Sequence, residues 1–224
     1  MKILIACEYS GRTRDAFIMR GFDAVSCDLL PTETPGPHHQ GDVRDILNDG
    51  WDLLIAHPDC TYLTNSAAWA YTDGPYHQKI KPETPVGADR RKLRQQALDF
   101  VRELMASSIT HIAIENPVGV ISTSIRPASQ YIQPYEYGHD ASKKTGLWLR
   151  NLPRLVPTCL VKGRFVEWPK GSGKVVQRWS NQTDSGQNCL TPSKDRWKDR
   201  SRTYQGWSDA MAGQWGEFLL SQKI

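Results

Sequence analysis

Residues 53–66 read LLIAHPDCTYLTNS and change character halfway along. Four apolar residues come first, followed by His57, Pro58, Asp59 and Cys60 and then by polar, turn-forming residues. A short apolar run bounded by turn signals indicates a buried strand. Cys60 therefore stands just beyond the end of a strand, on a turn that Pro58 stiffens. A thiol placed there faces a cleft and can serve as a nucleophile, whereas a cysteine inside a core is a small hydrophobe.

Other segments continue the pattern of strands and helices. Residues 2–7, 23–28 and 111–117 resemble strands, and residues 12–21 and 87–107 have the apolar spacing of helices. Strands that alternate with helices indicate parallel βαβ units. The sequence therefore predicts an α/β fold with a mostly parallel, doubly wound, Rossmann-like sheet.

Polar residues gather where the predicted strands end. The clusters are Glu8 to Arg12, Asp28, Asp42, residues 57–60 and residues 115–117. Ligands bind at the carboxyl ends of the strands in such sheets. The clusters therefore predict one active cleft.

Composition narrows the class of protein. With 224 residues and 39% hydrophobic residues, the chain can form one sizeable domain. No apolar run reaches the length of a membrane span, and the apolar run within the first residues is too short for a signal-peptide core. Five scattered cysteines without a CxxC spacing favour reduced thiols over disulfides or a zinc cluster. We expect a cytoplasmic chain with no membrane contact and no metal.

The net charge of +4 is unevenly distributed. Between Lys162 and Arg202 there are ten Lys or Arg and four Asp or Glu, a local balance of +6 that leaves −2 for the remainder. We expect a catalytic domain over 1–160 and 203–224 with a small basic insertion at 161–202 that contacts nucleic acid. The alternative is a solvated basic face. The candidate phosphate contacts are Lys194, Arg196, Lys198, Arg200 and Arg202.

The first turn and two aspartates indicate the type of cofactor. The turn ACEYSGRTRDAF (6–17) has one glycine and lacks the dinucleotide fingerprint. Asp28 is placed to accept hydrogen bonds from ribose hydroxyls and Asp42 to accept an adenine amino group, unless both are loop or cap residues. A nucleoside site that lacks a phosphate-binding loop indicates S-adenosylmethionine as the cofactor rather than NAD or ATP. The expected cofactor-binding residues are Glu8, Tyr9, Ser10, Gly11, Asp28, Asp42 and His57.

Two further interpretations concern Glu115 and His57. Glu115 ends another strand, where a buried carboxyl can hydrogen-bond a ring nitrogen of a substrate or merely cap a loop. His57 precedes Cys60 by three residues, and the two either form a Cys-His pair or do not touch. No further ligand at a recognisable spacing supports a metal site for them.

Together these motifs resemble the DNA cytosine-C5 methyltransferase family, in the compact form typical of phage-encoded members. Pro58-Asp59-Cys60 is similar to the family's Pro-Pro-Cys motif, and Glu115-Asn116-Pro117 to its Glu-Asn-Val motif. The likeness covers roughly residues 2–150, with a loose match in the last helix. Asp59 departs from the motif and places a carboxylate beside the thiol. The family's Gln-x-Arg-x-Arg motif is not obvious, although residues 143–150 or 200–202 could replace it, and a large target-recognition domain is missing.

The resemblance implies a mechanism. Cys60 would add to C6 of cytosine, Glu115 would act at N3 and the amino group, and Asn116 and Pro58 would support them. C5 would then accept a methyl group from S-adenosylmethionine. A base in duplex DNA would be flipped into the pocket, where the aromatic-rich loop 61–77 either closes over it or packs locally.

Three alternatives remain open. The enzyme could modify a free pyrimidine nucleotide or use a modified methyl donor. It could be a catalytically weak nucleic-acid-binding homologue in which Asp59 suppresses activity. It could also be an amino-methyltransferase, because HPDCTY (57–62) is faintly similar to an Asn/Asp-Pro-Pro-Tyr/Phe loop.

Overall fold

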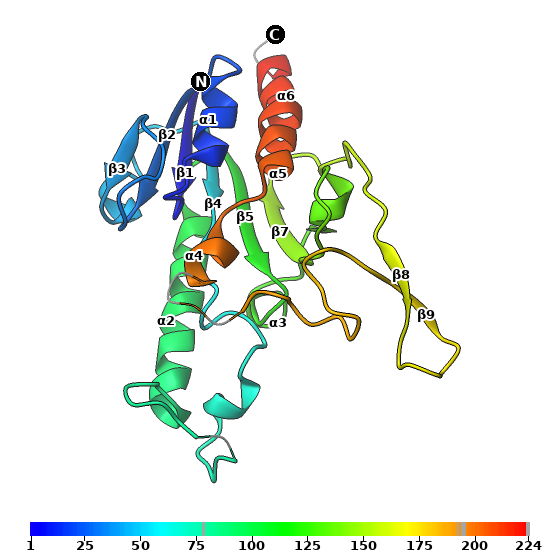
Figure 1. Cartoon of the computed structure of the whole chain (residues 1–224). Coiled ribbons are helices and arrows are strands. Elements are labelled where there is room, and N and C mark those ends of the chain that lie inside the picture. The colour runs from blue at the N-terminus through cyan, green and yellow to red at the C-terminus, as the bar shows by residue number, and fades with distance from the viewer. Residues whose placement is uncertain (78, 192, 194–195, 223–224) are drawn as a thin grey trace.

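A seven-stranded sheet forms the centre of the protein, with strand order β3-β2-β1-β4-β5-β7-β6 (Figure 1). The computed structural model describes residues 1–77, 79–191, 193 and 196–222. The strands of this sheet are β1 Lys2–Ala6, β2 Asp23–Asp28, β3 His38–Gln40, β4 Leu53–Ala56, β5 His111–Pro117, β6 Gln130–Ile132 and β7 Thr145–Arg150. 

The sheet is mostly parallel, as predicted. Strands β1 to β5 run in one direction, whereas β7 is antiparallel to both β5 and β6. This architecture is compatible with a Rossmann-like fold. The carboxyl ends of β1, β2, β4 and β5 lie along one edge, which we call the carboxyl edge.

Helices cover both faces of the sheet. On one face, α1 (Arg12–Ile18) packs beside a carboxy-terminal helix made of α5 (Gln205–Ala210), a π-helical turn (Met211–Trp215) and α6 (Gly216–Ser221). On the other face lies α2 (Gly87–Ala106). Residues 3–6 of β1 point alternately to opposite faces and are all buried, which explains its continuous apolar run.

Short elements occupy the connections. They are the 3-10 turns Val43–Asp45, Ala68–Tyr71 and Pro134–Glu136, the helices α3 (Ile121–Ser124) and α4 (Arg196–Ser201), and the strands β8 (Arg164–Glu167) and β9 (Val175–Arg178). β8 and β9 pair in an antiparallel ribbon separate from the main sheet. In the described part of the chain, no helix is long and apolar enough to cross a membrane.

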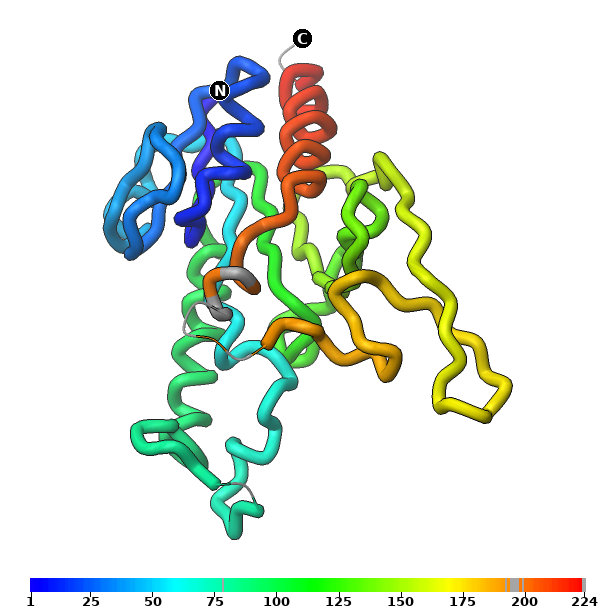
Figure 2. The backbone as a smooth tube through the Cα atoms, viewed as in Figure 1, coloured from blue at the N-terminus to red at the C-terminus, as the bar shows by residue number. Residues whose placement is uncertain are grey.

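Two arms extend beyond the carboxyl edge (Figure 2). The aromatic arm comprises residues 61–77 and 79–86 and the adjoining start of α2, and the ribbon arm comprises residues 162–178. Arg94 of α2 fixes the aromatic arm, because its guanidinium lies 3.3 Å from the ring centroid of Tyr71 and donates to the carbonyl of Tyr62. Tyr62 and Tyr71 therefore pack against α2, the helix that follows them in the chain.

Three strands of the sheet differ from the sequence-based expectation. β3, β6 and β7 lie where no strand was expected. β3 and β6 are three-residue strands at the two ends of the sheet, too short for an apolar alternation to show. β7 is recognisable only through its antiparallel pairing with β5.

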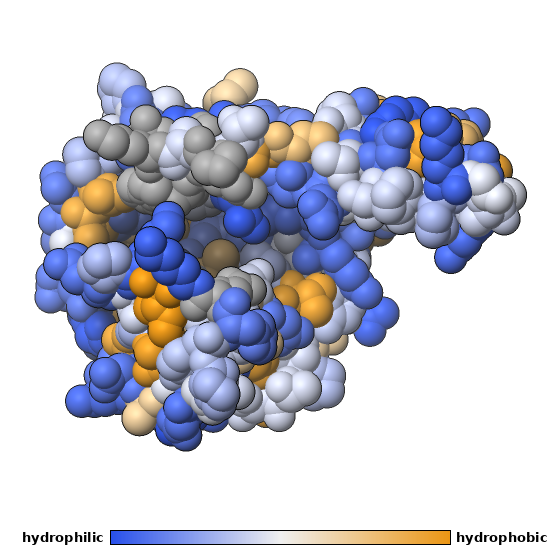
Figure 3. Space-filling model, turned by 60° about the horizontal axis from the view of Figure 1, so that its bottom comes forward, coloured by the Kyte–Doolittle hydropathy of each residue, from blue (hydrophilic) through white to orange (hydrophobic). Residues whose placement is uncertain are grey.

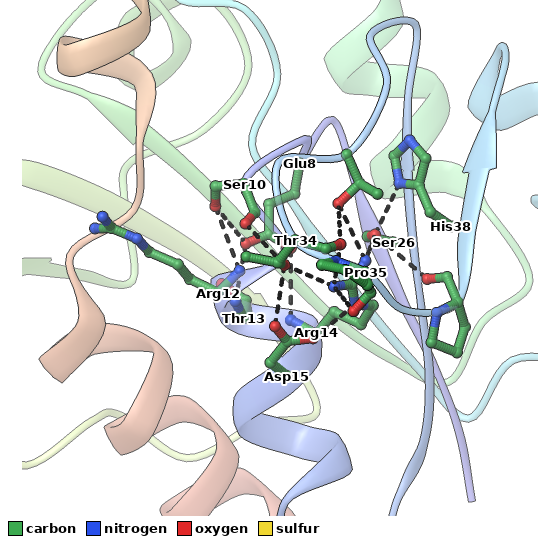
Figure 4. Close-up of polar contacts among 12 residues, drawn as sticks. Glu8, Ser10, Arg12, Thr13, Arg14, Asp15, Ser26, Thr34, Pro35 and His38 are labelled. Carbon is green, nitrogen blue, oxygen red and sulfur yellow. Dashed lines mark hydrogen bonds and ion pairs between the residues drawn. The ribbon is translucent and has the colours of Figure 1, made fainter.

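The fully buried side chain of Arg14 on α1 holds the loop after β2 (Figure 4). Its guanidinium donates to Ser26 Oγ of β2 and to acceptors within residues 32–35. Thr34 also crosses close to Gly11, where a Cβ atom would lie 2.1 Å from Thr34 Oγ1. A buried charge is tolerated when it is hydrogen-bonded throughout, so this network sets the path of the loop.

We expect Arg14→Ala to lower the free energy of unfolding by about 3 kcal/mol, because buried acceptors and the Asp15 carboxylate lose their donor. Urea unfolding should show a lower midpoint with an unchanged slope. The control, Arg20→Ala, removes an exposed arginine just beyond the same helix and should change stability by less than about 0.5 kcal/mol. Equal stability of the two variants would contradict the assignment.

Candidate active site

A hydrogen bond between two side chains joins the carboxyl ends of β4 and β5. His57 Nδ1 lies 2.9 Å from Glu115 Oε2, and the two side chains are only 7% and 10% exposed. Each follows or ends a fully buried apolar run, so each is carried to the carboxyl edge by its strand. The structure thus places His57 beside Glu115, which the sequence did not indicate.

The loops that follow these strands are also joined. Asn116 Nδ2 donates to the carbonyl of Pro58 at 2.7 Å, and Val120 N donates to the carbonyl of Leu63 at 2.8 Å. A Cβ atom at Gly119 would lie 1.9 Å from the Leu63 oxygen, so glycine is required there. These contacts hold the loop of Cys60 against the end of β5.

Three buried polar atoms at this junction have no hydrogen-bond partner among the described residues. They are His57 Nε2, Glu115 Oε1 and Asn116 Oδ1. Buried polar atoms are nearly always paired, and a concentration of unpaired ones is typical of a ligand site. Cys60 and Glu115, predicted separately, therefore border one polar site.

Electrostatics at Cys60 oppose a free thiolate. Burial raises the pKa of the Cys60 thiol, the nearby Lys143 ammonium counteracts this, and Asp59 and Glu115 raise it further. Arg200 adds a smaller opposing effect. At neutral pH the cysteine is therefore a thiol at rest.

Asp59 has a local structural role. Its Oδ1 accepts hydrogen bonds from the backbone N of Thr61, at 3.0 Å, and from Thr61 Oγ1, at 2.7 Å. This is the Asx turn that aspartate commonly forms. The residue that departs from the family motif therefore shapes the turn, although its charge still acts on Cys60.

Lys143 acts on this site, but the sequence did not single it out as a site residue. It lies two residues before β7, and its Nζ donates to the carbonyl of Arg200 on α4 at 3.1 Å. Because β7 is antiparallel, its amino end reaches the carboxyl edge. The segment 143–150 was noted only as a possible replacement for a missing motif.

The charge of Glu115 depends on its neighbours. Burial alone raises the pKa of its carboxyl, but the hydrogen bond from His57 and the charge of Lys143 outweigh burial. The pKa of Glu115 is therefore lower than usual, and the residue is a carboxylate at rest.

On the cofactor side, Glu8 caps α1. Its Oε1 accepts hydrogen bonds from Thr13 N at 2.8 Å and from Ser10 Oγ at 3.0 Å, and the residue is buried. The first amides of a helix are where Rossmann proteins bind a pyrophosphate. Here a carboxylate already takes that place, which fits a cofactor without phosphate.

The two predicted aspartates lie in different environments. Asp28 is half-buried at the end of β2, burial raises its pKa, and its Oδ1 accepts Leu30 N at 2.9 Å. The neighbouring Leu29 side chain is 73% exposed and offers an apolar surface. Asp42 caps a 3-10 turn and binds Arg44 through both its backbone N and its guanidinium, which lowers the Asp42 pKa.

Residues of the predicted basic segment are partly engaged within the protein. Arg202 forms two hydrogen bonds with Glu33, and Tyr9 Oη bonds Ser201 Oγ at 2.9 Å. Arg200 is exposed on α4. Arg196 begins α4, whereas its side chain, like the whole of Lys194, lies outside the described part.

The described residues contain no group of three or more His, Cys, Asp or Glu side chains that could hold a metal ion.

Comparisons with known proteins find likenesses among solved structures. No family model matches the sequence, and no curated protein matches it. The chain is similar to a solved E. coli structure described as a candidate DNA modification methyltransferase encoded within a prophage. The TM-score is 0.41 and the identity 13%, over 72% of this chain and 52% of that one. The chain therefore spans about half the length of that structure.

The electrostatics at Cys60 predict opposite effects for two variants. Lys143→Met should raise the pKa of the thiol and move its alkylation to higher pH, because a stabilising cation is lost. Asp59→Asn should move it to lower pH, because a repelling carboxylate is lost. Iodoacetamide labelling against pH, resolved by peptide mass spectrometry, measures both. Exposed Cys159 is the internal control, and shifts in the same direction would contradict this account.

Proposed function

We propose that the protein is an S-adenosylmethionine-dependent methyltransferase that acts on C5 of cytosine in DNA. The observation that carries the proposal is the junction of β4 and β5, where the Cys60 loop is held beside a buried Glu115 whose Oε1 has no partner among the described residues. A thiol and an acid at neighbouring strand ends are the two groups that pyrimidine C5 chemistry requires.

The chemistry follows from the weak nucleophilicity of C5. As Cys60 Sγ bonds C6, an electron pair moves into the ring, and Glu115 Oε1 takes up the thiol proton and passes it to N3. The ring then behaves as an enamine, and C5 takes up a methyl group. Loss of the C5 proton to a base expels Sγ and restores the double bond, and the N3 proton returns through Glu115 to the thiol. Because Cys60 is a thiol at rest, addition must be coupled to removal of its proton.

S-adenosylmethionine, when bound, would supply the electrophilic methyl group. Asp28 would accept hydrogen bonds from the ribose, beside the exposed Leu29. Glu8 shapes the turn by capping α1, together with Ser10 and Gly11. Asp42 would reach adenine only through an oxygen that it shares with Arg44.

The shape and charge of the carboxyl face suit a duplex. Figure 3 shows this face hollowed, with the ribbon arm projecting to one side. The ribbon arm carries five Lys or Arg and one Glu. A two-stranded ribbon fits the major groove of B-DNA, and lysines on it would contact phosphates. The target cytosine would be flipped toward Cys60.

A covalent trap tests the chemistry. Mixed with S-adenosylmethionine and DNA containing 5-fluorocytosine, the protein should form an adduct at Cys60, because fluorine cannot leave C5 as a proton does. Cys60→Ser should abolish the adduct, and Glu115→Gln should reduce its rate by at least about 100-fold. A 5-fluorinated free nucleotide run in parallel identifies the nucleotide alternative. Methyl transfer that survives Cys60→Ser would instead indicate amino methylation, and the proposal fails if cofactor binds but neither substrate is trapped.

Salt dependence tests the ribbon arm. Lys170→Gln with Lys174→Gln should reduce the slope of log affinity for duplex DNA against log salt by about 2, because each phosphate contact contributes about 0.9. Arg20→Gln with Arg154→Gln removes two exposed charges near the opposite edge and should leave the slope unchanged. Equal slopes in both double variants would exclude the ribbon arm as a DNA contact.

A further inference from the structure

We infer that His57 is a positioning residue that orients the Glu115 carboxylate toward the pyrimidine ring. This inference rests on the proposed function and assigns His57 a role in acid catalysis in place of the expected cofactor contact. It starts from the hydrogen bond of 2.9 Å between Nδ1 and Oε2 inside the sheet edge.

The geometry leaves one oxygen of Glu115 for the substrate. Oε2 is bonded to His57, whereas Oε1 is buried without a partner among the described residues. His57 Nε2 is likewise buried and unpartnered there, which favours the tautomer whose proton is on Nδ1, since a bare acceptor costs less than a stranded donor. Nδ1–H then donates to Oε2, and Oε1 is left to take up the thiol proton of Cys60 and pass it to N3.

The same hydrogen bond holds this orientation throughout the reaction. Because Glu115 is a carboxylate at rest, the bond from Nδ1–H is charge-assisted from the start and keeps Oε1 directed toward the ring. A group that is already held in its productive orientation lowers the barrier, because that orientation need not be reached during the reaction. Neither ring nitrogen of His57 has to gain or lose a proton, because the proton passes from the Cys60 thiol through Glu115 Oε1 to N3.

Other charged groups face this pair. Lys143, before β7, acts on both Glu115 and Cys60, and Asp59 and Arg200 act on Cys60. Lys143 shares with His57 the effect of favouring the Glu115 carboxylate. It makes no hydrogen bond to that carboxylate within the described residues, so only His57 can fix which oxygen faces the substrate.

Two substitutions distinguish the loss of the hydrogen bond to Glu115 from the loss of the imidazole volume. His57→Asn keeps an amide N–H near the place of Nδ1, and His57→Ala removes the donor. In His57→Ala the pH inflection that belongs to Glu115 should move to higher pH, and kcat should fall roughly 10- to 100-fold while the KM for S-adenosylmethionine stays within about twofold. His57→Asn should keep the inflection near its original pH and recover most of kcat.

A second measurement does not depend on activity. NMR titration of the Glu115 carboxyl carbon should show the same upward move in His57→Ala and its reversal in His57→Asn, with circular dichroism confirming that both proteins are folded. If the titration behaves so but no substrate is trapped at Cys60, the pairing stands and the proposed function fails. An unchanged Glu115 titration in folded His57→Ala, or a loss confined to the cofactor KM, overturns the inference.

Discussion

The burial of the Glu115 carboxylate is the constraint around which this site is built. A charge at the end of a buried strand is costly unless hydrogen bonds and opposite charges compensate for it. His57 bonds one oxygen, Lys143 contributes a positive charge, and the other oxygen has no partner among the described residues. The same arrangement that permits burial thus leaves a single acceptor for a substrate and ties β4 to β5.

A similar compensation organises the first turn and the loop after β2. Glu8 is buried because it bonds the first turn of α1, and Arg14 is buried because the loop after β2 surrounds its guanidinium. These two charges lie at opposite ends of a short stretch of chain and hold the turn and the loop in place. Asp28 is thereby set at the mouth of the sheet, half-buried beside an exposed leucine.

Much of the fold could be read from local pattern. The long apolar runs of β1, β4 and β5 are buried on both faces, so composition alone revealed them, and α2 has a helical period over its whole length. β7 could not be found in this way, because its role depends on pairing with β5. The packing of the aromatic arm also could not be predicted from local pattern, because its tyrosines pack on arginines of α2 that are distant in sequence.

For the site, the sequence by itself determined that Cys60 and Glu115 end two buried strands, because a strand that ends in polar residues delivers them to the sheet edge wherever its neighbours lie. It also indicated that the first turn lacks a phosphate cradle. Only the tertiary structure decided that β4 and β5 are neighbours, that His57 bonds Glu115, and that Lys143 arrives from an antiparallel strand. Strand order and the balance between burial and charge arise from contacts between residues that are distant in sequence, such as His57 and Glu115, and no local pattern records them.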